Sequence, residues 1–423
     1  MGKTFAEKVL SLKAGRSVSA GEIVVVEPDY CMSHENASNI SQIFQRIGAE
    51  KVWAPSKIVI VLDHTVPCST EAYANSHKMI REFTARQGIE NFYDLHLHGG
   101  ICHQIMSQEG YAAPGRLIIG TDSHTGTAGA VGALAIGIGR SEMAAVWTTG
   151  DIWLRVPESI KVVVEGKFQE GVYAKDLILY LLGILKADGA SYQCIEYHGS
   201  TIENMSIGER MTLCNMGIEM DAKASVCRPD KQVFLQVASR AKKKEYQYLW
   251  ADEGASYAKE IHIRAEEIVP AVAKPDRVDN YSPVTEVCGT RIDQVFIGSC
   301  TNGRLEDLHV AADILEGRQI KVRTIVNPAS YEVLHTAVND GTISTLLEAG
   351  CTVSPPGCGP CIGVSGGVLG ENEVCISTSN RNFKGRMGSR SASVYLARPA
   401  TTAYSALCGS IQDPRTFKKG GYV

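Results

Sequence analysis

Short, uninterrupted apolar runs punctuate the chain, and four of them end in a group of reactive side chains. The runs are 58–62, 117–120, 295–298 and 374–376. Continuous apolar runs of this length are typical of parallel strands that are buried on both faces. The side chains that follow are Asp63 and His64, then Asp122, Ser123 and His124, then Cys300, and finally Asn380 and Arg381. Because ligands bind at the carboxyl edge of open α/β sheets, the pattern predicts sheets from different domains facing one shared cleft.

The periodicity between these runs predicts helices and divides the chain into three domains. Thr4 and Glu7 have the spacing of a capping box at the start of an amphipathic helix. A separate middle region carries a strand-like run at 160–164 and a helical pattern at 177–185. We therefore expect three α/β domains, at 1–156, 157–275 and 276–423.

Composition narrows the class of protein. The 423 residues include 13 cysteines, without the apolar leader of a secreted protein, which favours a reducing, cytoplasmic location. The longest apolar run, 177–182, is far shorter than the roughly 20 residues that span a bilayer. The net charge is −4, and the one basic run, Lys242 to Lys244, continues into Glu245 and is typical of a solvated surface. Neither a membrane nor a nucleic acid is expected as a partner.

Three cysteines form the clearest candidate metal site. Cys358 and Cys361 flank a Gly-Pro turn, and Cys300 follows a buried strand, so the three thiolates can grip one soft metal centre such as an iron-sulfur cluster. A closed site needs a fourth ligand, for which Cys351 and Cys375 are candidates, although such cysteines are more often small buried hydrophobes. With a fourth ligand the site suits a cluster for electron transfer, and a cluster-free protein could instead hold zinc through the three cysteines. With an open iron it suits Lewis-acid catalysis.

Groups that transfer protons or bind carboxylates accompany the cysteines. The candidates are His64, His103 and His124 with the carboxylates Asp63, Asp122 and Glu219. Each histidine alone is more often a structural residue. Asp63 and His64 can cooperate only if the strand ends there, since neighbours on a strand face opposite sides. Arg381 and Arg386 could clamp carboxylates bidentately, or form an exposed basic loop.

Taken together, the motifs resemble the aconitase superfamily. They occur in the family order between about residues 60 and 386, and comprise Asp63-His64, His103, Gly120 to His124, Cys214 to Gly217, Gly298 to Asn302, Pro355 to Cys361 and Asn380 to Arg386. The compact length resembles the large subunits of the branch that contains isopropylmalate dehydratases, homoaconitases and methylmalate-type dehydratases. The resemblance implies a three-domain architecture with parallel-containing sheets around a central cluster cleft.

The resemblance also implies roles for individual residues. A [4Fe-4S] cluster would be bound by Cys300, Cys358 and Cys361, with one iron open to substrate and water. Asp63 and His64 would handle the departing hydroxyl, while His103, and His124 oriented by Glu219, would tend the metal-bound water. The remaining implied site residues are Asp122 and Ser123 in the catalytic set, Asn215, Asn302 and Asn380 beside the cluster, and Arg381 and Arg386 as substrate carboxylate ligands.

Two departures from the aconitase pattern refine these expectations. His34, followed by Glu35, stands where aconitases place a glutamine near the substrate, which favours the isopropylmalate-like branch over citrate and makes His34 a substrate-binding candidate. Only residues 387–423 follow Arg386, too few for the swivelling fourth domain of single-chain aconitases. We expect that domain, with the catalytic serine, on a separate small subunit.

The expected activity is thus that of a hydro-lyase on a branched hydroxy-dicarboxylate. The leading substrate pair is 2-isopropylmalate and 3-isopropylmalate, as in leucine biosynthesis. The alternatives are homoaconitase, a methylmalate or dimethylmalate dehydratase and, from a different class, an iron-sulfur electron-transfer protein.

Overall fold

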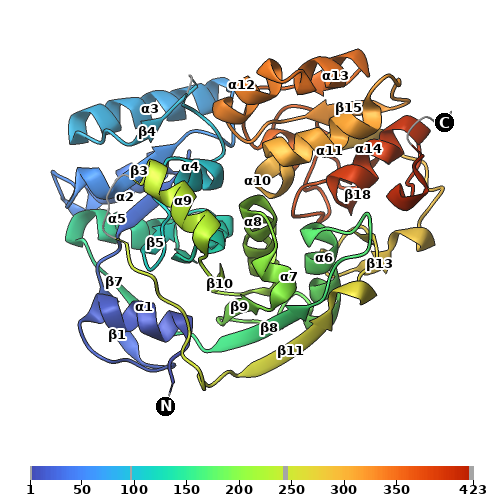
Figure 1. The fold of residues 1–423 in the computed structure, drawn as a ribbon. Coiled ribbons are helices and arrows are strands. Elements are labelled where there is room, and N and C mark those ends of the chain that lie inside the picture. The colour runs from blue at the N-terminus through green and yellow to red at the C-terminus, as the bar shows by residue number, and fades with distance from the viewer. Residues whose placement is uncertain (1, 96–97, 242–245, 419–423) are drawn as a thin grey trace.

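Three sheets of mainly parallel strands surround the centre of the molecule (Figure 1). The computed structural model describes residues 2–95, 98–241 and 246–418, so the basic run from Lys242 to Glu245 lies outside the described residues. Among the described helices, none has both the length and the apolar character that a membrane crossing requires.

The first sheet has five parallel strands in the order β4-β3-β2-β5-β6. Its strands are β2 (Tyr30–Ser33), β3 (Ile58–Val61), β4 (Phe92–Tyr93), β5 (Leu117–Gly120) and β6 (Leu134–Gly137). Every residue of β2, β3 and β5 is buried, which explains why their sequences do not alternate between apolar and polar. The two predicted strands in this region are β3 and β5.

Helices and a small antiparallel ribbon cover this sheet. The helices are α1 (Phe5–Ala14), α2 (Ala37–Ile47), α3 (Glu71–Gln87), α4 (Cys102–Gln108) and α5 (Arg140–Thr149), with 3-10 segments η1 (Pro55–Lys57) and η2 (Ser123–Val131). The ribbon pairs β1 (Ile23–Val26) with β7 (Ile152–Arg155). The predicted capping box is present at α1, where Thr4 and Glu7 exchange both hydrogen bonds, and Gly15 ends the helix in a left-handed conformation.

The second sheet has four parallel strands in the order β10-β9-β8-β11. Its strands are β8 (Ser159–Glu165), β9 (Cys194–His198), β10 (Ala224–Cys227) and β11 (Lys259–Arg264). The helical segments in this part of the chain are α6 (Ala174–Leu185), α7 (Ser200–Glu203), α8 (Ile207–Met216), η3 (Gly217–Met220), α9 (Lys231–Arg240) and η4 (Ala265–Glu267), of which α9 packs in the hydrophobic cluster of the first sheet. The predicted strand at 160–164 and helix at 177–185 correspond to β8 and α6.

The third sheet has seven strands in the order β13-β12-β18-β17-β14-β15-β16, and β12 runs antiparallel to both of its neighbours while the other pairs are parallel. Its strands are β12 (Ala271–Ala273), β13 (Tyr281–Pro283), β14 (Gln294–Ile297), β15 (Arg323–Val326), β16 (Thr352–Val353), β17 (Val374–Ser377) and β18 (Ser393–Leu396). The helical segments are η5 (Val284–Glu286), α10 (Ser299–Asn302), α11 (Leu305–Leu315), α12 (Tyr331–Asn339), α13 (Thr342–Glu348), η6 (Gly359–Ile362), α14 (Pro399–Cys408) and η7 (Pro414–Thr416). Strand β12 belongs to the third sheet, although it precedes residue 276, where the third domain was expected to begin. The expected domain boundaries stay a prediction.

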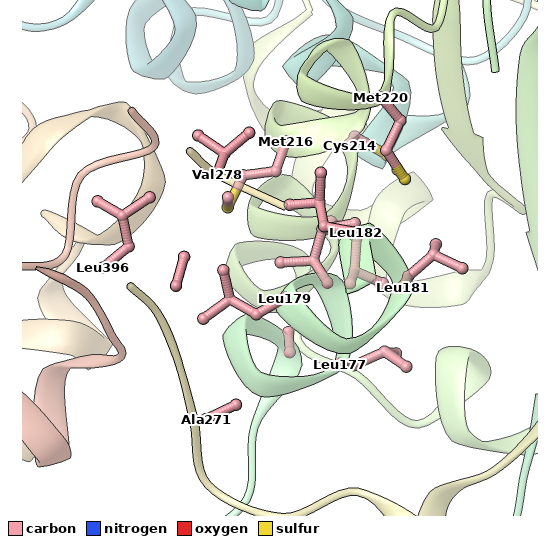
Figure 2. Close-up of a cluster of buried hydrophobic side chains, with 14 of the residues drawn as sticks. Leu177, Leu179, Leu181, Leu182, Cys214, Met216, Met220, Ala271, Val278 and Leu396 are labelled. Carbon is pink, nitrogen blue, oxygen red and sulfur yellow. The ribbon is translucent and has the colours of Figure 1, made fainter. Parts of the chain in front are cut away.

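A shared hydrophobic core joins the second and third sheets. Figure 2 shows the leucines of α6, among them Leu179 and Leu182, close to Met216 at the end of α8. The same cluster includes Ala271 of β12 and Leu396 of β18. Full burial of each leucine contributes roughly 1.5–3 kcal/mol. This packing holds α8 against the third sheet, where α10 carries Cys300.

A close backbone approach joins the first and second sheets. A Cβ atom added to Gly129 of η2 would lie 1.7 Å from the carbonyl oxygen of Ser225 in β10, so only glycine fits. Segment η2, which contains His124 and directly follows Asp122, also packs against α8 and η3. Residues of all three sheets thereby meet at the centre.

Candidate active site

One cavity of about 130 Å³ collects most of the candidate site residues. The residues that line it are His64, His103, Asp122, Ser123, His124, Cys300, Cys358, Cys361, Ile362, Asn380, Arg381 and Arg386. They include residues that follow β3, β5, β14 and β17, the four strands that the apolar runs predict. The prediction of one cleft shared by the carboxyl edges of different sheets is confirmed.

The three cysteines of the motif are buried in this cavity, with 8%, 6% and 4% of Cys300, Cys358 and Cys361 exposed. The side-chain amides of Asn215 and Asn380 both donate to the sulfur of Cys300, at 3.2 Å and 3.3 Å. Two converging N–H donors suit an anionic sulfur. Burial, reinforced by the neighbouring Cys361 and Asp122, raises the pKa of Cys300 to about 12. The thiolate form therefore needs a cation among the three sulfurs.

The donor set of the cavity fits an iron-sulfur cluster. Three sulfurs and no further thiol line the described cavity, and Arg386 places Nη2 3.9 Å from the sulfur of Cys361. Such N–H groups stabilise the negative charge of a thiolate-bound cluster. Cys351 and Cys375, the candidate fourth ligands, pack instead into two hydrophobic cores.

His64 and Asp63 form the first of three hydrogen-bonded units around the cavity. Strand β3 ends at Val61, as their cooperation requires, and Nδ1 of His64 lies 2.6 Å from Oδ1 of Asp63. Burial lowers the pKa of His64, but the charges of Asp63 and Cys358 and the hydrogen bond to Asp122 outweigh it and raise the pKa well above its usual range. These neighbours therefore favour the protonated ring, the form that can act as an acid.

Asp122 organises the second unit. Its Oδ1 lies 2.6 Å from Nε2 of His103 and accepts the backbone N–H of His124 at 2.8 Å. Its Oδ2 is 3.4 Å from Nε2 of His64. Burial raises the pKa of Asp122, but the charge and hydrogen bonds of the surrounding histidines prevail and hold the pKa well below its usual value. The ionised carboxylate orients two imidazoles around one space.

Glu219 organises the third unit. Its Oε1 is 2.7 Å from Nε2 of His124 and accepts from Nε of Arg381 at 2.8 Å. Burial raises the pKa of Glu219, and the stronger influence of His124 and Arg381 brings the pKa below its usual range. The expected pairing of His124 with Glu219 is present, and Arg381 shares the same carboxylate.

The remaining candidates lie around or apart from the cavity. Ser123 lines it, with Oγ 3.4 Å from Nδ1 of His124. His34 stacks on the ring of His64 at 4.1 Å between centroids. Asn302 is not among the lining residues, because its amide bonds Asp307 at 2.9 Å and it borders a separate cavity.

Sequence reasoning missed two features of the site. Ile362 supplies an apolar wall directly after the Cys358–Cys361 turn. Glu35 accepts the backbone N–H groups of His64 and Thr65 at 2.8 Å and 2.9 Å. The available signal was that His34 and Glu35 also follow a strand, β2, at the carboxyl edge of the same sheet.

Comparison with known proteins agrees with this geometry. The aconitase family (aconitate hydratase) matches residues 7–409. The chain belongs to the aconitase family. Among relatives in the family, the 3-isopropylmalate dehydratase large subunit 1 of Methanopyrus kandleri is 50% identical over 420 residues, 99% of this chain and 100% of the relative. The probable methanogen homoaconitase large subunit of Methanosarcina mazei is also 50% identical, over 93% of this chain and 100% of its own length.

A solved structure supports the fold assignment. The crystal structure of aconitase X from Thermococcus kodakaraensis, in its holo form, superposes with a TM-score of 0.51 at 12% identity, over 92% of this chain and 93% of that one. The aconitase-like α/β fold expected from the motifs is therefore confirmed.

Proposed function

We propose that this chain is the cluster-binding large subunit of a hydro-lyase that interconverts 2-isopropylmalate and 3-isopropylmalate in leucine biosynthesis. The observation that carries the proposal is the single cavity in which three thiols, three histidines and two arginines meet. The 50% identity to a 3-isopropylmalate dehydratase large subunit over nearly the whole chain supports the choice of substrate.

Cys300, Cys358 and Cys361 would hold a [4Fe-4S] cluster. Three cysteine ligands leave one iron without a protein thiolate. When bound, that iron supplies Lewis-acid chemistry toward a substrate hydroxyl and carboxylate. Asn215 and Asn380 would stabilise the Cys300 end through the amide N–H groups that they already direct at its sulfur.

His64 is the proposed acid for the departing hydroxyl. Its Nδ1 is held by Asp63, which leaves the proton on Nε2 facing the Asp122 side of the cavity. Transfer by a positioned imidazolium contributes typically about 10²–10⁴-fold to a rate. His103, held by Asp122, and His124, held by Glu219, would exchange protons with the water that leaves and returns.

Arg381 and Arg386 are the proposed carboxylate ligands. Glu219 engages Nε of Arg381, so its two Nη groups are left for a substrate carboxylate. No described residue accepts a hydrogen bond from Nε of Arg386, whose Nη2 faces the sulfur of Cys361. Planar guanidinium groups bind carboxylates bidentately, which fixes the substrate relative to His64.

A small subunit with the swivelling domain would complete the site. Within the cavity, each of the three histidines is paired with a carboxylate, and removal of the substrate proton needs a further base. We propose that the partner supplies this base as a serine, together with the pocket that receives the branched side chain.

A homoaconitase is the second candidate, because a probable homoaconitase large subunit is equally identical to this chain. The test is to load the chain with iron and sulfide anaerobically, combine it with its small subunit, and assay 2-isopropylmalate, homocitrate and methylmalates side by side. Turnover of 2-isopropylmalate is expected. Preference for homocitrate or a methylmalate would overturn the substrate assignment and keep the hydro-lyase.

The same preparation separates the other classes of function. Elemental analysis is expected to give iron and inorganic sulfide in equal amounts, bound only while Cys358 is intact. Zinc without sulfide would overturn the cluster assignment. A reversible one-electron cluster that turns over none of the acids would instead indicate an electron-transfer protein.

A further inference from the structure

Glu35 sits where the central strand of the first sheet ends, two residues after β2. Its side chain is 10% exposed. Oε1 accepts the backbone N–H groups of His64 at 2.8 Å and of Thr65 at 2.9 Å, and lies 3.3 Å from the hydroxyl of Thr65. One carboxylate oxygen, two residues after β2, therefore lies within hydrogen-bond distance of three donors in the turn that follows β3.

The turn held by Glu35 is the one that joins the acid to a cluster cysteine. The carbonyl of Asp63 accepts the backbone N–H of Cys358 at 2.9 Å, and Oδ2 of Asp63 accepts the N–H of Cys102 at 2.7 Å. With Glu35 on its other side, the turn is fixed from three separate segments. A shift at Glu35 would therefore reach both His64 and Cys358.

The surroundings of Glu35 favour its ionised form. Burial raises its pKa, but the imidazoles of His34 and His77, each 3.5 Å from a carboxylate oxygen, and the charge of His64 prevail and hold the pKa well below its usual value. His77 adds a second support, with Nε2 3.1 Å from the hydroxyl of Thr65. An ionised acceptor makes shorter and stronger hydrogen bonds to N–H groups than a neutral one.

We propose that Glu35 is a positioning residue that fixes the turn carrying His64 and ties it to Cys358, acting through backbone hydrogen bonds and not by touching the substrate. Because this role presupposes the hydro-lyase proposed above, its test has one arm that is independent of activity. A chemically similar residue provides the control. Asp29 stands at the opposite end of β2 and accepts the backbone N–H of Leu117 at 2.7 Å.

The first arm measures amide hydrogen exchange by mass spectrometry on the full cluster-loaded chain. In Glu35→Ala, the amides of His64 and Thr65 are expected to exchange at least about tenfold faster, with the rest of the chain unchanged. Asp29→Ala should accelerate exchange at Leu117 and leave His64 protected. Unchanged protection at 64 and 65 in the Glu35 variant would overturn the proposal, as would a uniform acceleration along the chain.

The second arm measures turnover with the small subunit. Supporting residues of this kind typically change activity by about 10–100-fold, and Glu35→Ala should lower kcat by that factor with KM within about twofold. Glu35→Gln keeps an oxygen acceptor and should recover kcat to within about threefold of the wild type, with protection at His64 restored. Asp29→Ala should keep the wild-type kcat.

The outcomes separate the positioning role from the proposed function. If Glu35→Gln is as impaired as Glu35→Ala while its amides stay protected, charge and not positioning is responsible, and the proposal fails. An increase in KM alone would equally overturn it, because it indicates contact with substrate. A wild-type enzyme inactive on every tested acid would refute the proposed function, whereas the exchange arm would still decide the role of Glu35.

Discussion

Replacing Glu219 by glutamine should show how strongly one buried carboxylate holds the site together. Glu219 is the only acceptor recorded for both Nε2 of His124 and Nε of Arg381 among the described residues, at 2.7 Å and 2.8 Å. Only 3% of its side chain is exposed. Glutamine keeps the shape, removes the charge, and puts an amide N–H₂ in place of one carboxylate oxygen, such as Oε2, which lies 3.1 Å from Nε of Arg381.

The expected cost follows from these contacts. A hydrogen bond to a charged group contributes about 1.5–3 kcal/mol, and the remaining amide oxygen can replace only part of two such bonds. The side chain of Arg381 is 20% exposed, so water compensates it in part. We expect Glu219→Gln to lower the free energy of unfolding of the metal-free chain by about 2–4 kcal/mol. A double-mutant cycle with Arg381→Gln should give a coupling of about 1.5–3 kcal/mol.

Urea unfolding of the reduced chain, followed by circular dichroism and tryptophan fluorescence, measures these energies. Glu332 is the matched control, because its carboxylate accepts from Arg240 at 2.7 Å and 2.8 Å, equally short distances. This pair is exposed, with 47% of the Glu332 side chain and 39% of the Arg240 side chain accessible. Glu332→Gln should cost at most about 1 kcal/mol. Equal costs for the two variants, or no coupling between Glu219 and Arg381, would refute the reasoning that burial makes this network strong.

Three further changes probe other parts of the structure. Burial lowers the pKa of Lys175 to about 7, against an ordinary 10.5, so between pH 7 and 10.5 the unfolded chain holds the proton and the folded chain does not. The free energy of unfolding should therefore rise with pH in this range. In urea titrations, Lys175→Met should reduce this slope by up to about 1.4 kcal/mol per pH unit. Gly129→Ala should lower the free energy of unfolding by about 3 kcal/mol or more in thermal unfolding, because its Cβ would lie 1.7 Å from the backbone oxygen of Ser225. Gly126→Ala should be tolerated, because its Cβ would lie 3.4 Å from the backbone oxygen of Cys214. By iron analysis, Cys358→Ser should lose the metal and Cys375→Ser, altered in a hydrophobic core, should retain it.

The strands that deliver the chemistry could be predicted because burial on both faces leaves a visible trace. Strands β3, β5, β14 and β17 are continuous apolar runs, and each is followed by polar residues that line the cavity. Strand β2 escaped notice, although it is equally buried, because only Cys31 and Met32 between Tyr30 and Ser33 are apolar, a shorter run than in the other four strands. Because β2 was not predicted, the role of Glu35 was missed as well. The backbone N–H groups that Glu35 accepts, those of His64 and Thr65, are about 30 positions away along the chain.

Two other residues could not be assigned from the sequence, because their place in the chain does not show which partner their side chains bind. Lys175 reads as one charge in an apolar helix, but its Nζ donates to the carbonyls of Thr378 and Ser379 at 3.0 Å and 2.7 Å, directly before Asn380. Asn302 lies beside a cysteine in the motif, yet the turn of α10 directs its amide to Asp307. Spacing along a chain limits which residues can meet, whereas the packing of three sheets decides which do.

The hydrogen bonds that orient the site also connect all three sheets, and this has a consequence for how the site could open. Asn215, from the second sheet's helix α8, donates both to Thr127 at 2.8 Å and to the sulfur of Cys300 at 3.2 Å. Glu219 bridges His124 to Arg381 in the same manner. Any hinge between the sheets would break acid, cysteine and arginine contacts together, and each buried polar group so exposed costs about 1–3 kcal/mol. The described sheets should therefore move as one body during turnover, and access to the cavity should depend on motion of the proposed small subunit relative to it.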